Sequence, residues 1–287
     1  MPSLSRPDTP CLETEWRRPH NDLQTQEVGG GHKAIHDDET AEAAGFTGAP
    51  IHGTVHWSQF TPLLLQAFGP QWFETGTISV AFKNIVTHLQ PVKAFIEQPE
   101  EGQTSCDIWM EHLDGTPVLD GTASIGDIDA TEVSRQLAKV KPVKGGLVFM
   151  PQPVGTTTTN VEKAKISFGE PIGPLFPFTL EQKLECITEY HPWFDAESGK
   201  SSPWGRPILP PESLNQILFV TSDRARWPKG SSRLPAGVSP VGLFGGTTRP
   251  HPHASHHLAI RPSVNCMHGS AFNLMQTCVH MCVLCRL

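Results

Sequence analysis

Long apolar runs are absent from this sequence of 287 residues, and so are clusters of lysine and arginine. Because a membrane-spanning helix needs about 18 or more consecutive apolar residues, we expect no membrane segment. The formal charge is −7 at pH 7, and a net acidic chain without a basic cluster is poorly suited to bind nucleic acid or an anionic membrane. We therefore predict partners other than nucleic acid or a membrane.

Cysteine is scarce over most of the chain. Only Cys11, Cys106 and Cys186 precede the final segment, which is far too few for a disulfide framework and favours a reducing compartment. The first residues lack the apolar core of a secretory signal, and acidic residues come too early for a typical mitochondrial presequence. We expect a cytoplasmic protein, or a peroxisomal or mitochondrial-matrix one. The peroxisomal option rests on Cys-Arg-Leu at 285–287, which loosely resembles the peroxisomal Ser-Lys-Leu signal.

The composition is that of a folded protein with many turns. Hydrophobic residues make up 38% of the chain and charged residues 18%, which is enough apolar material for a core. The 25 glycines and 27 prolines imply many turns and long connections. At this length, one large domain or two smaller ones are expected.

One long apolar segment predicts a buried helix. Residues 54–69 are mostly apolar and end at Gly69-Pro70, and a helix this apolar is buried on most sides. Pro62 either kinks this helix or opens a second helical turn.

Four later segments predict strands of an antiparallel sheet. Residues 76–82 alternate apolar residues with smaller or polar ones, as a half-buried strand does. The three further segments are 92–97, 104–112 and 118–125. Asp114-Gly115, between the last two of these segments, is a strong hairpin-turn signal. We predict an α+β fold in which the sheet wraps around one buried helix.

The second half contains a weak internal repeat of the first. Residues 48–59 align without a gap with residues 205–216 and share Gly, Pro, Ile and Gln, each segment leading into an apolar helix. Leu180, Leu184 and Ile187 give residues 179–190 the spacing of an amphipathic helix.

The predicted organisation has four parts. Residues 247–287, the tail, lack Asp, Glu and Lys and show no strand meander. We therefore expect the tail to be irregular and disordered, as a result of an altered reading frame or altered splicing. The parts are a first domain at 1–140, a linker at 141–165, a partial second domain at 166–246 and the tail at 247–287.

The chemical centre of the sequence lies at residues 36–60. It contains Ile35-His36-Asp37-Asp38, then an alanine-rich turn up to Phe46, then Pro50-Ile51-His52-Gly53 before the apolar helix. This pattern resembles the signature of the MaoC-like (R)-specific enoyl-thioester hydratases and dehydratases, over roughly residues 30–126. The resemblance implies a hotdog fold, often a double hotdog, and acyl substrates bound to CoA or to an acyl carrier protein. It also fits a homodimer, or an intramolecular pseudo-dimer of the two halves.

Adding water to an enoyl thioester requires a general base or acid and a donor for the enolate-like oxygen. His36 suits the first role, because the unperturbed pKa of a histidine side chain lies near neutrality. The backbone N–H of Gly53 suits the second, because the first N–H groups of a helix are unpaired and glycine allows close approach. We predict His36, Asp38 and Gly53 as catalytic residues. The predicted substrate-binding residues are His52, His56, Trp57 and Glu189.

The sequence departs from the family pattern at its acid. The family's catalytic Asp lies five residues before the His, where this chain has Gly31, and Lys33-Ala34 replaces Asn-Pro. In the second repeat Glu189 keeps an acid in register, but Phe194 replaces the His. Three alternatives remain open: another acid serves His36, His36 acts alone in an isomerisation or cyclisation, or the site is inactive. The candidate acids are Asp37, Asp38 and Glu189.

Several of these residues also have simpler interpretations. Asp38 is equally suited to be the N-cap of the turn at 39–44, and Glu189 is equally well a solvated charge at a helix end. His56 is either a pocket-lining or a core residue. Cys282 and Cys285 have zinc-ligand spacing, but a second pair framing an ordered loop is missing, so we predict no metal and no cofactor.

The leading hypothesis is a hydro-lyase acting on enoyl or 3-hydroxyacyl thioesters in fatty-acid or polyketide-type metabolism. One alternative is a tailoring dehydratase, isomerase or cyclase of natural-product biosynthesis that acts on a substrate other than a CoA thioester. The other is a catalytically inactive hotdog subunit that binds an acyl chain or a partner.

Overall fold

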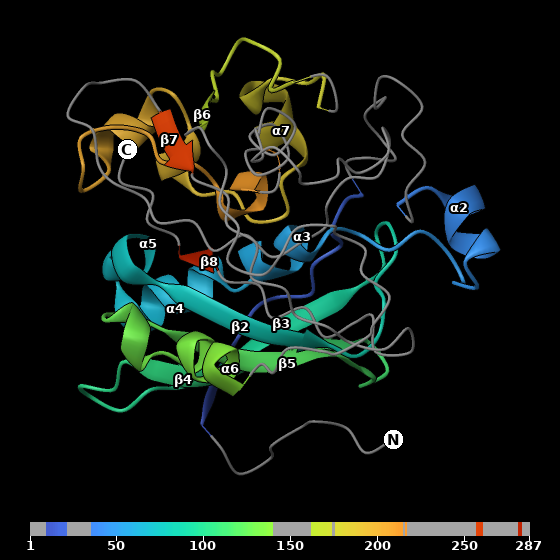
Figure 1. Ribbon diagram of the computed structural model, residues 1–287, viewed down its shortest axis with the longest axis horizontal. Coiled ribbons are helices and arrows are strands. Elements are labelled where there is room, and N and C mark those ends of the chain that lie inside the picture. The colour runs from blue at the N-terminus through green and yellow to red at the C-terminus, as the bar shows by residue number, and fades with distance from the viewer. Residues whose placement is uncertain are drawn as a thin grey trace, which may run out of the picture.

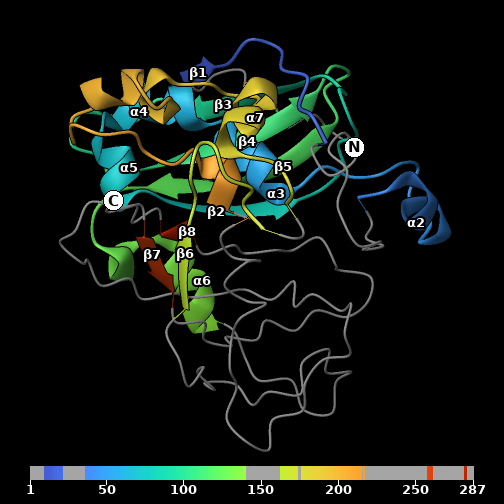
Figure 2. The same ribbon diagram turned by 90° about the horizontal axis from the view of Figure 1, so that it is seen from above.

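The computed structural model shows one antiparallel sheet covered on one face by short helices, with the second half of the chain packed above those helices (Figures 1 and 2). The residues that the structure describes are 10–21, 36–139, 162–173, 176–214, 216, 257–260 and 281–282.

The sheet has six strands in the order β1-β3-β4-β5-β2-β8, and every neighbouring pair is antiparallel. Asp114 and Gly115 form the turn between β4 and β5, with Gly115 at φ 79°, as the sequence predicts. The strands are β1 (Cys11–Glu13), β2 (Thr77–Phe82), β3 (Val92–Glu97), β4 (Ser105–His112), β5 (Pro117–Ser124) and β8 (Met281–Cys282). The four strands predicted from the first half are confirmed.

Three consecutive helices lie across one face of this sheet (Figure 1). They are α3 (Gly53–Ser58), α4 (Thr61–Phe68) and α5 (Gln71–Thr75). Pro62 sits in the first turn of α4, so it opens a second helix rather than kinking one long helix. Gly69 ends α4 at φ 64°, a conformation that glycine adopts without strain.

The hydrophobic core lies between these helices and the sheet. Phe60 and Leu64 are fully buried, and they pack over the inward-facing residues of the strands. On β3 the inward residues Val92, Ala94 and Ile96 are fully buried and alternate with partly exposed ones. A sheet wrapped in this way around a central helix is the hotdog arrangement, and the predicted α+β hotdog fold is confirmed.

Within the described residues, the second half contributes one helix, three 3₁₀ turns and a two-stranded antiparallel sheet of β6 (Glu162–Lys165) and β7 (His257–Ile260). The helix is α7 (Leu180–Cys186), which Thr179 caps together with Gln182 in a capping box. It ends four residues before the predicted end at 190, because Ile187 turns to extended backbone at φ −65° and ψ 137°. The 3₁₀ turns are η2 (Pro192–Phe194), η3 (Ser198–Ser201) and η4 (Pro211–Ser213).

The structure places the two aligned repeat segments against each other. Helix α3 lies between the sheet and the second half, and η4 packs directly on it (Figures 1 and 2). Gln59 donates from Nε2 to the carbonyl oxygen of Val55 at 3.2 Å. Its repeat counterpart Gln216, with its amide turned to face acceptors, donates in the same way to the carbonyl oxygen of Glu212 at 3.3 Å. The shared geometry supports the predicted internal repeat, and within the described residues the second half lacks the strands of a complete second hotdog.

The domain boundaries stay a prediction, although the structure adds detail to them. Part of the predicted linker forms β6, and parts of the predicted tail form β7 and β8. The rest of both segments lies outside the described residues, together with Gly31, Lys33, Ala34, the cysteine pattern of the tail and the C-terminal Cys-Arg-Leu. Within the described part, no helix is both long and apolar enough to cross a membrane.

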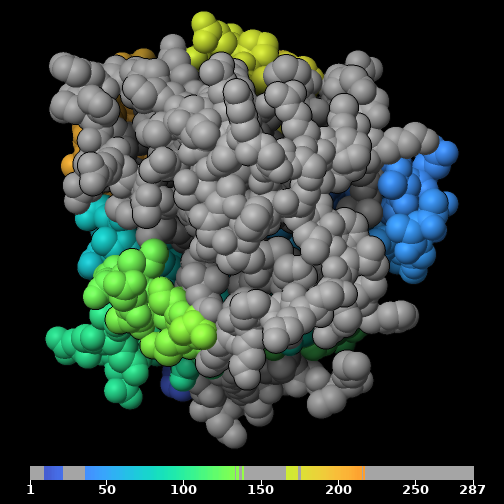
Figure 3. All heavy atoms as spheres, viewed as in Figure 1, coloured from blue at the N-terminus to red at the C-terminus, as the bar shows by residue number. Residues whose placement is uncertain are grey.

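Two helices lie at the outside of the molecule. Helix α2 (Asp38–Ala43) stands at the periphery beside the sheet, and α6 (Glu132–Lys139) follows the short turn η1 (Ile128–Ala130) after β5. In the space-filling view both are visible on the surface at opposite sides of the face shown (Figure 3). The chain therefore reaches α3 from an exposed helix, through the loop that carries Pro50 and His52.

Candidate functional site

The predicted motif begins at the N-terminus of helix α2, where Asp37 and Asp38 form hydrogen bonds with backbone N–H groups. Asp37 is its N-cap: the residue is extended at φ −107° and ψ 145°, and its Oδ1 accepts a hydrogen bond from the Thr40 N–H at 2.9 Å. The alternative that Asp38 is the cap is therefore wrong, because Asp38 is already the first helical residue. Its Oδ1 instead accepts from the Ala49 N–H at 3.0 Å, which ties α2 to the loop before α3. The catalytic role of Asp38 stays a prediction.

His36 lies against the beginning of α3. Its Nδ1 is 2.6 Å from the carbonyl oxygen of Pro50, and its ring stacks on His52 with centroids 3.9 Å apart. A carbonyl oxygen can only accept, so Nδ1 carries the proton and, in the neutral ring, Nε2 carries the lone pair. The Asn21 side chain also donates to the His36 carbonyl oxygen at 3.0 Å. The loop thus sets both the position and the tautomer of this imidazole.

The start of α3 itself is tightly built. His52 is its N-cap residue and is 7% exposed, and the first hydrogen bond of the helix runs from the Val55 N–H to the His52 carbonyl oxygen at 3.1 Å. A Cβ added to Gly53 would lie 3.3 Å from Cζ of Phe82. The predicted residues His36, His52 and Gly53 are therefore brought together, at a point where the backbone has little room for a side chain.

His56 and Trp57 point into the interior. They are 3% and 5% exposed, and the His56 ring lies 5.4 Å from the ring of Phe82. Burial, together with the nearby His112, lowers the pKa of His56 to about 3, so its imidazole is neutral at physiological pH. The interior position fits the core alternative, and substrate contact by either residue stays a prediction.

Glu189 belongs to a different contact. It forms an ion pair with Arg17, with Oε1 and Nε 2.5 Å apart, and it is 9% exposed. Burial raises the pKa of Glu189 more than Arg17 lowers it. Glu189 is thus not a solvated charge, and its ion-pair partner is Arg17. Its roles as an acid for His36 and in substrate binding stay predictions. It lies beyond the end of α7 rather than on it.

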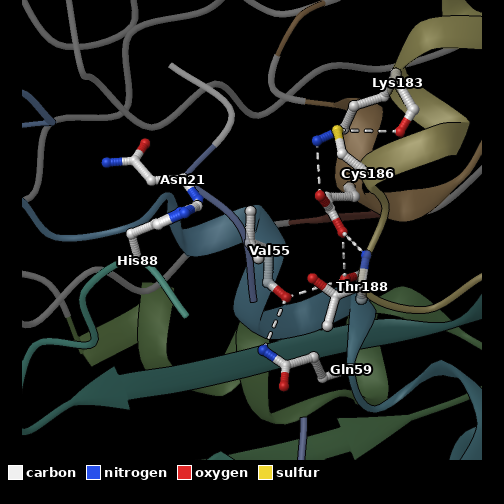
Figure 4. Close-up of polar contacts among 9 residues, drawn as sticks. Asn21, Val55, Gln59, His88, Lys183, Cys186 and Thr188 are labelled. Carbon is white, nitrogen blue, oxygen red and sulfur yellow. Dashed lines mark hydrogen bonds and ion pairs between the residues drawn. The ribbon is translucent and has the colours of Figure 1, made fainter. Parts of the chain in front are cut away.

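A buried charged network joins the two halves, and the sequence analysis did not identify it. Lys183 and Glu212 are 0% and 1% exposed and form an ion pair at 2.6 Å. Glu212 also accepts from the Ser58 hydroxyl at 3.1 Å and from the Thr188 N–H at 3.4 Å (Figure 4). The signal was present: Lys183 is three residues after Leu180, on the apolar face that the helical spacing already defined.

Two further polar residues of the site region were also missed. His88 accepts from the Asn21 N–H at its Nδ1, 3.0 Å away, on the same segment that holds the His36 backbone (Figure 4). His112, on β4, is 8% exposed and contributes to lowering the pKa of His56. No sequence pattern singles out these two histidines, because the residues beside them are distant in the sequence. Among the described residues, no group of histidine, cysteine and acidic side chains is arranged to hold a metal ion.

Comparison with solved structures finds hotdog proteins. An (R)-hydratase from A. caviae involved in PHA biosynthesis aligns over 41% of this chain and 96% of its own, at 16% identity and a TM-score of 0.30. A putative MaoC domain dehydratase from Chloroflexus aurantiacus aligns over 73% of this chain and 68% of its own, at 12% identity and a TM-score of 0.45. A conserved double-hotdog protein from Mycobacterium tuberculosis aligns over 75% and 74%, at 12% identity and a TM-score of 0.41. No protein-family model matches the sequence, and no curated protein sequence does.

These likenesses concern the fold. The chain's own antiparallel sheet and central helix form the hotdog arrangement that the sequence analysis predicts. What the site does must be argued from its own residues.

Proposed function

We propose that this protein is a hydro-lyase that hydrates enoyl thioesters or dehydrates 3-hydroxyacyl thioesters. The observation that carries the proposal is the placement of His36: Pro50 fixes its Nδ1–H, and His52 stacks on its ring at the beginning of α3. A histidine with a defined tautomer beside unpaired helix N–H groups combines a base with an oxyanion donor.

In hydration, Nε2 of His36 takes a proton from water while the water oxygen bonds to the β-carbon of the enoyl thioester. The electron pair of the double bond moves to the thioester carbonyl and forms an enolate. The Gly53 N–H donates a hydrogen bond to that oxygen. The imidazolium of His36 then returns its proton to the α-carbon, which restores the carbonyl and the neutral base. Dehydration is the reverse sequence.

The remaining site residues have supporting roles in this proposal. Asp38 or its neighbour Asp37 supplies the negative charge that stabilises the imidazolium. The Asp38 carboxylate also accepts a hydrogen bond from the N–H of Ala49, the residue before Pro50. His52, His56 and Trp57 lie along the first turns of α3, where the acyl part of the substrate is bound. The carrier of the acyl group is CoA or an acyl carrier protein.

The test is hydration of a short enoyl-CoA, followed by loss of the enoyl absorbance, with wild type and His36→Ala. General acid–base catalysis contributes about 10²–10⁴-fold, so we expect a loss of that size. His191→Asn is the matched control: His191 caps η2 in the second half, and asparagine preserves a cap there. Equal rates in wild type and His36→Ala would reject the proposal.

A second candidate function rests on the sequence at position 31. Glycine there, in place of the acid of MaoC-like enzymes, favours a tailoring dehydratase, isomerase or cyclase that acts on a substrate other than a CoA thioester. Gly31→Asp separates the two. A large gain in hydratase rate indicates a decayed hydratase site, whereas an unchanged rate favours the tailoring activity or an inactive acyl-binding subunit.

A further inference from the structure

Asn21 joins the backbone of His36 to a second histidine. Asn21 is fully buried, and its side-chain Nδ2 donates a hydrogen bond to the carbonyl oxygen of His36 at 3.0 Å. The backbone N–H of Asn21 donates to Nδ1 of His88, also at 3.0 Å (Figure 4). Burying an amide costs free energy unless it is hydrogen-bonded, so these bonds hold a buried asparagine in place. Asn21 is therefore a fixed point to which the His36 backbone is attached.

The segment that carries Asn21 is bound to the sheet. Arg17 and Val92 exchange two backbone hydrogen bonds, at 2.8 Å from the Arg17 N–H and at 3.0 Å from the Val92 N–H. Two residues further along, the carbonyl oxygen of Pro19 accepts from the Leu89 N–H at 2.8 Å. Residues 17–21 therefore run along the start of β3 and the loop before it, and the sheet fixes their position.

His88 serves as an acceptor in this arrangement. Its Nδ1 accepts from the Asn21 N–H, so Nδ1 is unprotonated and Nε2 carries the proton of the neutral ring. The ring of His20 meets that of His88 edge-on, with centroids 5.4 Å apart. Burial and His20 lower the pKa of His88 more than Asp38 raises it, which keeps the ring neutral at physiological pH. His88 thus offers Asn21 a lone pair under the conditions in which the protein works.

His36 is consequently held on both sides of its Cα. The carbonyl oxygen of Pro50 holds the ring at Nδ1, 2.6 Å away, and Asn21 holds the backbone at the carbonyl oxygen. With the ring contact alone, the backbone of His36 could shift and turn the ring about that contact. With both contacts, the direction in which Nε2 points is set. A general base must lie within about 2.6–3.2 Å of the proton that it takes, so this direction matters for the reaction.

We propose that Asn21 is a positioning residue for His36. Through the His36 carbonyl oxygen it sets where Nε2 of His36 points, while His88 and the sheet hold Asn21 itself. This inference rests on the proposed function in one respect, because it takes His36 as the base of the reaction. It makes the segment 17–21, which lies outside the motif at 36–60, a part of the catalytic arrangement.

Asn21→Asp tests the bond with the smallest change in shape, because it keeps the backbone N–H for His88 and turns the donor toward His36 into an acceptor. We expect kcat for hydration of a short enoyl-CoA to fall by about 10- to 100-fold with little change in KM, since a misplaced base slows the reaction without weakening binding. Asn84→Asp is the matched control: Asn84 also donates from Nδ2 to a backbone carbonyl, that of Pro117, at 2.7 Å. Where hydration depends on His36, equal kcat values for the two variants would overturn the inference.

A pair of variants at His88 tests the same arrangement without altering Asn21. The Oδ1 of an asparagine can accept in place of the histidine Nδ1, whereas leucine offers no acceptor. We expect His88→Leu to lower kcat as Asn21→Asp does, and His88→Asn to retain most of the wild-type value. His88 is only partly buried, so both variants are expected to fold, which urea unfolding checks. Equal kcat values in His88→Leu and His88→Asn would contradict the role of His88 in holding Asn21.

A measurement on the ring itself separates this inference from the proposed function. In nitrogen NMR of isotope-labelled histidine, the signals of His36 are those that disappear in His36→Ala, and they report which ring nitrogen carries the proton. We expect the proton on Nδ1 in wild type and in Asn84→Asp, and a mixture of the two tautomers in Asn21→Asp. Unchanged His36 signals in Asn21→Asp would reject the inference, even if hydration depends on His36.

The opposite combination is equally decisive. Altered His36 signals in Asn21→Asp, together with hydration that does not depend on His36, would reject the hydro-lyase mechanism and support the positioning of His36 by Asn21.

Discussion

Nδ1 of His36 lies 2.6 Å from the carbonyl oxygen of Pro50, and this contact determines which ring nitrogen of His36 can act as a base. Because Nδ1 must carry the proton, the lone pair of the neutral ring is on Nε2. The same loop presents His52 and Gly53 at the start of α3. A flexible surface histidine would have neither a fixed tautomer nor a fixed neighbour.

The Gly53 position gives a first prediction. A Cβ on Gly53 would lie 3.3 Å from Cζ of Phe82, so Gly53→Ala forces a small shift at the start of α3. A misplacement of about 1 Å can cost about 10²-fold in rate, so we expect this smaller shift to lower kcat/KM by less than that, with little change in stability. Gly169→Ala is the control, since nothing lies within 4 Å of its added Cβ. Equal hydration rates for the two variants would contradict the proposed role of the Gly53 backbone.

The buried pair of Lys183 and Glu212 gives a second prediction. Lys183→Met leaves the Glu212 carboxylate buried without its cation, and breaking such a pair typically costs about 3–5 kcal/mol of stability. We expect the urea midpoint to fall accordingly. The double variant Lys183→Met/Glu212→Leu is expected to recover much of the loss, because no unpaired charge remains.

The control for this prediction is the exposed pair of Lys200 and Glu197, which also lies at 2.6 Å but has side chains 62% and 82% exposed. Solvent screens that pair, so Lys200→Met is expected to change stability by less than about 1 kcal/mol. Equal losses from Lys183→Met and Lys200→Met would contradict the stabilising role of the buried pair.

Glu111 gives a prediction about pH. Burial raises the pKa of Glu111 above its usual value of 4.5, and Oε1 has no hydrogen-bond partner within the described chain. Between pH 4.5 and the raised value the folded state binds more protons than the unfolded state, so this group makes the free energy of unfolding fall as pH rises through that window. Above the raised value its contribution no longer changes with pH.

Glu111→Gln removes this titration. Urea unfolding at a series of pH values is therefore expected to show the variant gaining stability relative to wild type as pH rises through the window, and a constant difference above it. A difference between wild type and variant that does not change with pH would contradict the raised pKa.

Much of the first half could be predicted from sequence because its signals are local. Periodicity gave the helix at 54–69 and the strands, and Asp114-Gly115 gave the hairpin. Pro62 left two possibilities that only packing decided, in favour of two helices. The N-cap alternative named Asp38, one residue late, since Asp37 and Asp38 are chemically alike and only the backbone angles separate them.

The site was predictable only in part. The motif located His36, His52 and Gly53, which do lie together. The partner of Glu189 is Arg17, 172 residues away in the sequence, and no local pattern reports a contact at that separation. Lys183 was hidden for another reason: a lysine on an apolar helical face is ordinarily assigned to solvent, unless its buried partner is known.

The central claim is that His36 is the base of a hydro-lyase. The most direct measurement is the pH dependence of kcat/KM for hydration of a short enoyl-CoA, in wild type and in His36→Ala. The account predicts that the wild-type rate falls at low pH as one ionisable group is protonated, and that His36→Ala loses both this titration and about 10²–10⁴-fold of the rate. An unchanged rate and an unchanged pH profile in His36→Ala would contradict it.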